Sequence, residues 1–126
     1  MSFSNTYETN VLTWTFTTGA VTRPTAWYIG LFTSDPGEAQ GGTEVSGGSY
    51  VREAVTFTVS GDTATNSAAI EWPVATASWG TITHIAVYDA STSGTQIAYA
   101  ALTSSKTIST GDVLRIPAGD LDITLN

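Results

Sequence analysis

The sequence predicts an all-β fold, a jelly-roll-like β-sandwich of about eight short strands with a short N-terminal helix or extended arm. Short runs that alternate apolar and polar residues follow one another along the chain, and clusters of Gly, Pro, Asp and Ser separate them. Threonine supplies 23 of the 126 residues, and β-branched side chains suit a pleated, half-buried surface. We expect an N-terminal segment over residues 1–20, packed on or extending from a single sandwich domain over residues 21–126.

The N-terminal segment combines two conflicting patterns. Asn5 and Glu8 have the spacing of a capping box, and large apolar residues recur at helical spacing as far as Trp14. The stretch 13–18 instead alternates Thr with aromatic residues, as a strand does, and is poor in helix formers. We therefore expect a short helix over residues 5–12 that leads into an extended piece.

The first half of the domain predicts three strands, over residues 26–33, 52–59 and 63–72. The first strand is apolar on both faces, which favours a central position in a sheet. The second alternates cleanly, so Val55, Phe57 and Val59 are expected to face inward. A turn with the sequence SDPG and a long Gly-rich loop separate these two strands.

The second half predicts five more strands, over residues 81–88, 96–102, 106–108, 113–116 and 121–125. Turn clusters that contain Gly or Pro separate most of them. The run 96–102 is nearly all apolar and is expected to be buried on both sides.

The composition excludes several classes of partner. Charged residues make up 12% of the chain, and 4 Lys and Arg stand against 11 Asp and Glu, for a net charge of −7. A nucleic-acid-binding protein needs clustered cations to displace counterions from phosphate, so we expect no nucleic-acid partner. The apolar runs are too short to span a bilayer and no secretory signal is visible, so we expect no membrane partner. Without cysteine there is no disulfide, thiolate zinc site or cysteine nucleophile.

The search for catalytic patterns predicts no enzyme, no metal and no cofactor. His84 is the single histidine, and no serine stands in a Gly-x-Ser-x-Gly frame beside which it could act. Asp120 and Asp122 are expected to point to one side of a strand, where they protect a sheet edge rather than bind calcium. The Gly-rich loop over residues 41–48 lacks the Lys-Ser/Thr end of a phosphate-binding loop.

The aromatic residues predict a contact surface. Four Trp and five Tyr are many for a small domain, and such residues are enriched in interfaces because they supply contact area at low entropic cost. Trp27 is expected in the core, whereas core, protein interface and sugar-stacking platform all stay open for the others. The partner-interface candidates come from the N-terminal segment, the Gly-rich loop and two strand ends: Trp14, Gly47, Gly48, Tyr50, Trp72 and Trp79.

Five segments carry a family resemblance in their order along the chain. They are MSFSN at the start, YIGLFTSDPGE at 28–38, EVSGGSYVR at 44–52, SWGTITH at 78–84, and ALTSSKTI at 101–108 with the following Gly111–Asp112. Together they resemble a family of short, β-rich bacteriophage virion proteins that are often labelled tail fibre proteins. The similarity covers nearly the whole chain, although relatives tend to carry a charged, Leu-rich helix where this chain has TWTF at 13–16. The resemblance implies a place in the virion, assembly in the host cytoplasm and no enzyme activity.

Within a virion, the size and pattern favour a capsid decoration or cement protein. A fibre usually needs length or a repeat, and this chain shows no repeat. We expect a compact domain that binds the major capsid protein, stabilises the lattice and forms a homo-oligomer on the particle. Two alternatives stay open, a tail-associated fibre or receptor-binding module that recognises glycans, and a small hydrolase that uses His84. Because the chain carries few charges, attachment is expected to depend little on salt.

Overall fold

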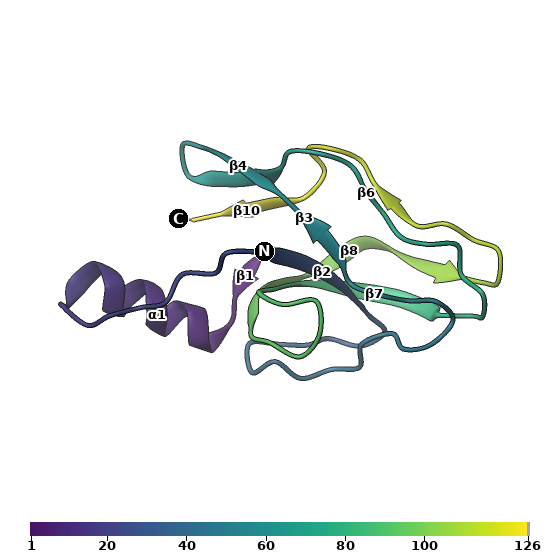
Figure 1. Cartoon of the computed structure of the whole chain (residues 1–126), viewed down its shortest axis with the longest axis horizontal. Coiled ribbons are helices and arrows are strands. Elements are labelled where there is room, and N and C mark those ends of the chain that lie inside the picture. The colour runs from purple at the N-terminus through teal and green to yellow at the C-terminus, as the bar shows by residue number, and fades with distance from the viewer. Residues whose placement is uncertain (126) are drawn as a thin grey trace.

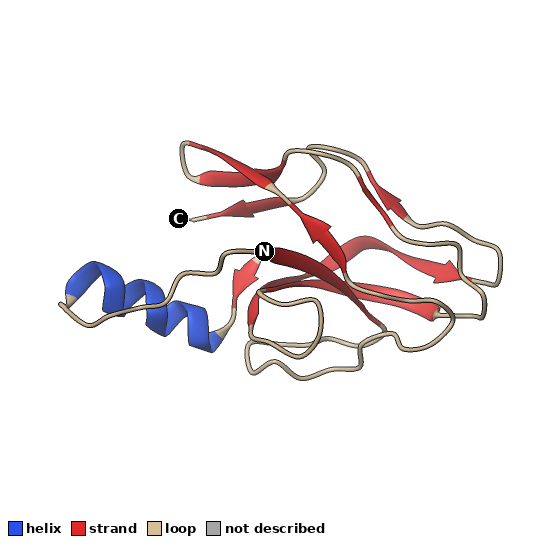
Figure 2. Cartoon of the chain, in the orientation of Figure 1, coloured by secondary structure: helices blue, strands red, loops and turns tan. Residues whose placement is uncertain are grey.

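The structure is a computed structural model that describes residues 1–125, so the last residue of the predicted domain, 126, lies outside the described residues. It is β-rich with one short N-terminal helix, which confirms the predicted all-β class (Figure 2). The elements are β1 (Ser2–Phe3), α1 (Asn5–Phe16), β2 (Trp27–Phe32), β3 (Glu53–Val55), β4 (Phe57–Ser60), β5 (Thr63–Asn66), β6 (Ile70–Glu71), β7 (Gly80–Tyr88), β8 (Gln96–Ile108), β9 (Arg115–Ile116) and β10 (Asp122–Thr124).

The strands form one large antiparallel sheet and two smaller ones (Figure 1). The large sheet has the order β1-β8-β7-β2-β3, and its two inner strands pair Ile29 with Val87 and Leu31 with Ile85. A three-stranded sheet has the order β10-β5-β4, and β6 pairs with β9 as a ribbon. The strand that is apolar on both faces, β2, therefore lies inside the large sheet, as its sequence predicts.

The core lies between the large sheet and the elements that cover it. Ile29, Leu31 and Ile82 have no exposed surface, and residues of the smaller sheets join them in one cluster. Trp72 and Trp79 belong to this cluster, with 1% and 4% of their surface exposed. Fully burying side chains of this size stabilises a domain by roughly 1.5–3 kcal/mol each or more, so these residues hold the sandwich together.

The strand bounds differ from the prediction at three places. The predicted strands at 96–102 and 106–108 are one continuous strand, β8, whose second half is largely exposed and pairs with the first half of β7. The predicted strand 52–59 is two strands, β3 and β4, and the predicted strand 63–72 is β5 and β6; in each case the two parts belong to different sheets. The clean alternation over 52–59 continues through the change of sheet, so local periodicity does not mark where one sheet ends and the next begins.

Candidate interaction surface

Helix α1 projects from one end of the sandwich and is anchored at its root (Figure 1). Ser4 is buried, its backbone N–H donates to Ile97 O at 2.9 Å, and its hydroxyl donates to Gln96 O at 2.6 Å. The Ser4 hydroxyl also accepts from the N–H of Tyr7 at 3.3 Å, so Ser4 is the N-cap. The expected capping box of Asn5 and Glu8 is wrong, because Asn5 is already the first helical residue.

The helix runs four residues past its predicted end. It includes the stretch over 13–16 that was expected to be extended, and it ends where the N–H of Thr17 donates to Thr13 O at 3.1 Å. The preference of Thr and aromatic residues for strands depends on packing against neighbouring strands. No described strand pairs with this stretch, and it continues the helix that Ser4 caps.

Apolar side chains occupy two opposite sides of α1. At about 100° per residue, Tyr7, Val11 and Trp14 fall on one side and Leu12 and Phe16 on the other. None of the helix residues is buried, and Leu12, Trp14 and Phe16 expose 58%, 59% and 77% of their surface. A helix that is apolar on more than one side is normally covered by other elements. The exposed apolar side chains of α1 make it a candidate contact surface.

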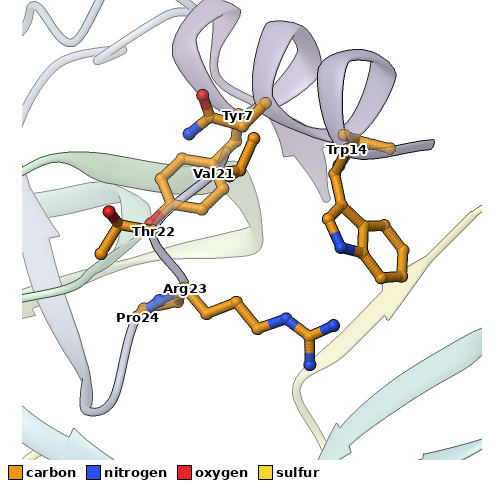
Figure 3. A pocket seen from close by; sticks show the side chains of 8 residues that line it. Tyr7, Trp14, Val21, Thr22, Arg23 and Pro24 are labelled. Carbon is orange, nitrogen blue, oxygen red and sulfur yellow. The ribbon is translucent and has the colours of Figure 1, made fainter. Parts of the chain in front are cut away.

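The segment that follows α1 returns along the Tyr7 side of the helix. A hollow of about 260 Å³ lies between the two, and its lining includes Tyr7, Trp14 and Val21 (Figure 3). The guanidinium of Arg23 stands 5.0 Å from the centre of the Trp14 ring, a cation–π contact that holds the return segment beside the helix tip. The interface candidate Trp14 thus lies on the surface, and the Leu12–Phe16 side of the helix faces away from this contact.

The two larger sheets separate toward the end that carries the helix. Along β3 and β4 the inward-facing residues lose burial stepwise, from Val55 at 6% exposed to Phe57, which is partly buried, and Val59 at 75%. Val59 therefore lies on the expected inward face but, at 75% exposed, is not covered there. Along β10 the exposed fraction rises in the same way from Leu121, at 5%, to Leu125, at 53%. The inner apolar face of the small sheet continues beyond the elements that cover it.

An apolar groove occupies this opening, which we call the end groove. It has a volume of about 330 Å³ and lies beside a smaller hollow of about 170 Å³ that shares Phe3, Val59, Ala64 and Ile123 with it. Its lining comes from both sheets: Phe3, Trp27, Phe57, Val59, Ala64, Val87, Ile97 and Ile123. Phe3 directly precedes the cap residue Ser4, so the groove lies at the root of the projecting helix.

The structure brings three of the predicted interface candidates together as a structural unit. The indole N–H of the buried Trp79 donates to Gly48 O at 2.8 Å, and its ring meets that of Tyr50 edge to face at 5.5 Å. Gly48 has a φ of +59°, and a Cβ at this position would lie 2.9 Å from the Trp79 ring nitrogen. Burial removes Trp79 from the surface that a partner or a sugar could reach.

The other loop candidates are placed differently. Gly47 is exposed with a φ of +77°, and a Cβ there would meet no atom within 4 Å. Trp72, expected at a surface, is buried in the core, and its indole N–H has no hydrogen-bond partner among the described residues. Of the six candidates, Trp14 and Gly47 are therefore the exposed ones.

A cluster around Arg52 holds the Gly-rich loop and was not anticipated from the sequence. The guanidinium makes two hydrogen bonds to the Glu44 carboxylate, each at 2.8 Å, and stacks 3.6 Å above the Tyr88 ring. It also donates to Ala90 O at 3.0 Å and to Ser93 O at 2.7 Å. The partners are separated along the sequence, so no local motif signals the cluster. It fastens the loop before β3 to the turn between β7 and β8.

The same carboxylate orders Tyr50. The Tyr50 hydroxyl donates to Glu44 Oε2 at 2.6 Å and accepts from the N–H of Leu31 at 2.9 Å. Burial, followed by the hydrogen bond to Glu44, raises the pKa of Tyr50 far above its ordinary value. Tyr50 is therefore a fixed part of the loop's support.

A hydrolase site in this chain would have to use His84, the single histidine. Its Nδ1 is 2.8 Å from the hydroxyl of the adjacent Thr83, and its Nε2 is 3.8 Å from the largely exposed Asp35 carboxylate. The second distance is too long for a hydrogen bond, so Asp35 does not orient the ring as the acid of a catalytic triad does. None of the hollows lined by the helix, the loop or the groove includes His84.

Among residues 1–125 we find no cluster of three or more His, Cys, Asp or Glu side chains arranged to hold a metal ion. Within the same range, no helix has the length and apolar character needed to cross a bilayer.

Comparison with known proteins gives one family. The model of the podophage GP4 fiber I protein gp80 family matches residues 2–124, which is nearly the entire chain. A search of curated proteins gives no match. The match agrees with the resemblance to phage virion proteins and with their tail fibre label. The match over residues 2–124 identifies the chain as a member of the podophage GP4 fiber I protein gp80 family, a structural protein of the phage virion.

Proposed function

We propose that the protein is a subunit of a fibre on the phage particle, and that it acts by binding other subunits rather than by catalysis. The observation that supports this most is the uncovered apolar end of the molecule, where α1 and the end groove lie together. The family description, a fibre protein, agrees with it. Because the sequence shows no repeat, a contribution to a long structure would have to come from association with other subunits.

Two features favour a structural role over an enzymatic one. His84, the side chain that a hydrolase would have to use, lines none of the hollows described. The side chains of Glu44, Tyr50 and Arg52 hydrogen-bond to one another, so they act as a rigid structural support for the loop.

Localisation on intact particles tests this proposal. A short epitope inserted at the exposed turn after Ser109, away from the helix and the end groove, can be labelled with gold-tagged antibody and viewed by electron microscopy. Label on the projections of the tail is expected. Label that is absent from purified particles would refute any virion role of this kind.

A second candidate is decoration of the capsid, with the major capsid protein as the partner. The single small domain without a repeat favours it, because such a domain can occupy one lattice position. The same labelled particles decide between the two, since a decoration protein would give label spread over the head. In both cases we expect particles washed in high salt to retain the protein, because the exposed end of the molecule is apolar.

A further inference from the structure

We propose that the end of the molecule is a joint between two copies of this chain, in which each copy places the Leu12–Phe16 side of α1 into the end groove of the other. This rests on the proposed function as a fibre subunit and names its first partner, a second copy.

The apolar face of the end groove is continuous with the hydrophobic core but is not covered. Val59 lies opposite Ala64, and Ala64 lies opposite Ile123, so these three side chains form one apolar row across the small sheet. The row continues the face that is buried at Val55 and Leu121, and exposure reaches 75% at Val59. A face of this kind needs apolar side chains opposite it, and α1 carries them uncovered at Leu12 and Phe16.

Charge favours a second copy as the occupant. Two copies with a net charge of −7 each repel one another over most of their surface. Residues 9–22, which contain most of the helix and its return, include no charged side chain, and neither does the lining of the end groove. These two surfaces are thus where like copies can approach with the least repulsion.

The exposed apolar area is a little over half of what a standard interface buries. The side chains Leu12, Phe16, Val59 and Leu125 together expose on the order of 450 Å² per copy, while a standard interface buries about 800 Å² per partner. Covering these residues would supply the apolar centre of an interface, and the neighbouring Thr and Ser residues its polar rim.

The position of the two surfaces predicts a closed pair. Phe3 in the groove is adjacent in sequence to the cap of α1, and Figure 1 shows the helix and the described end of β10 at the same end of the molecule. When the helix of one copy enters the groove of a second, the helix of the second is beside the groove of the first. Both contacts can then form together around a two-fold axis.

Sedimentation equilibrium of the purified full chain tests the pairing. We expect a species of twice the 13.2 kDa of one chain, and a dissociation constant that increases at least tenfold in Leu12→Ser and Phe16→Ser. Val113→Ser is the matched control, because Val113 is also exposed, at 45%, but lines neither groove nor helix hollow. A protein that stays monomeric at millimolar concentration, or a dimer insensitive to both helix variants, would overturn the proposal.

Cross-linking tests the geometry independently of stability, and the absence of cysteine makes it specific. A Phe16→Cys protein is mixed under mild oxidation with a Val59→Cys protein that carries an added tag, so that the mixed dimer differs in size from either homodimer. We expect the mixed disulfide to form at least ten times faster than with a tagged Val113→Cys protein. Equal rates would show that the helix does not reach the groove of the second copy.

The two proposals fail separately. A protein that labels the fibre but stays monomeric and gives no selective cross-link retains the proposed function and loses the joint. A protein that pairs in solution through Phe16 and Val59 but is absent from particles keeps the joint and loses the function.

Discussion

Replacing Glu44 with Gln isolates the contribution of the charge cluster to stability. The variant keeps the shape of the side chain and removes its charge, and one of its two oxygens becomes a donor. Oε2 already accepts from both the Tyr50 hydroxyl and Arg52 Nε, so the amide oxygen can keep that position, and the amide nitrogen then takes the place of Oε1 and removes the second 2.8 Å hydrogen bond of Arg52. The guanidinium cannot turn to water, because its side chain is only 8% exposed and lies above the Tyr88 ring.

The magnitude follows from this burial. Removing one partner of a buried ion pair costs about 3–5 kcal/mol, whereas an exposed pair contributes about 0–1 kcal/mol. The Glu44 side chain is 24% exposed, so some water reaches the carboxylate and the lower end of the first range applies. We therefore expect Glu44→Gln to reduce the free energy of unfolding by about 3 kcal/mol, which for a domain of this size lowers the Tm by about 10 °C.

Urea unfolding followed by Trp fluorescence measures this difference. The variant and the unmodified protein must have equal m-values, which shows that the same folded and unfolded states are compared. Glu71→Gln is the control, because Glu71 is exposed on β6 and should change stability by less than about 0.5 kcal/mol. If the two variants lose the same small amount, Glu44 and Arg52 form an ordinary surface pair and the reasoning about the cluster is wrong.

Three further predictions concern the loop, the alkaline range and the helix root. Gly48→Ala should lose at least about 1 kcal/mol more than Gly47→Ala by urea unfolding, because both have positive φ but only at Gly48 would the new Cβ meet Trp79. Because burial raises the pKa of Tyr50, the folded chain keeps a proton that the unfolded chain releases near pH 10. Stability should therefore be unaffected by this group below about pH 10 and fall above it, by up to about 1.4 kcal/mol per pH unit, and a flat alkaline profile would contradict this. Ser4→Ala should cost about 1–2 kcal/mol and reduce the helical circular dichroism signal, since the hydroxyl both caps α1 and fixes it to β8.

Local patterns in the sequence predicted most of the fold. The apolar runs of β2 and β7 form neighbouring inner strands of the large sheet, because burial on both faces requires a position inside a sheet. What the patterns could not supply is pairing over distance. The contact of Trp79 with Gly48 joins residues 31 apart, and the sequence around either one is compatible with a surface position as well as with the core.

The candidate surface was predicted less well, and two residues show why. Trp72 next to a proline resembles an exposed aromatic at a strand end, but the ribbon of β6 and β9 folds over the core and buries it. Val59 shows the reverse, because its alternation gives the correct face of β4, yet 75% of its surface is exposed where the end groove opens. Periodicity reports which side of a strand is apolar, and the extent of the opposite layer decides whether that side is covered.

An open end of this kind links assembly to stability. In the isolated chain, α1 is a helix of twelve residues with none buried, a length at which helices are marginal in water without tertiary packing. Covering its Leu12–Phe16 side would order the helix tip and complete the core above Val59 at the same time. Since a partner that binds the folded state alone stabilises it by mass action, both effects should increase with protein concentration. If the proposed joint forms, the chain would be least stable at the surface that meets the second copy, and assembly would make that surface rigid.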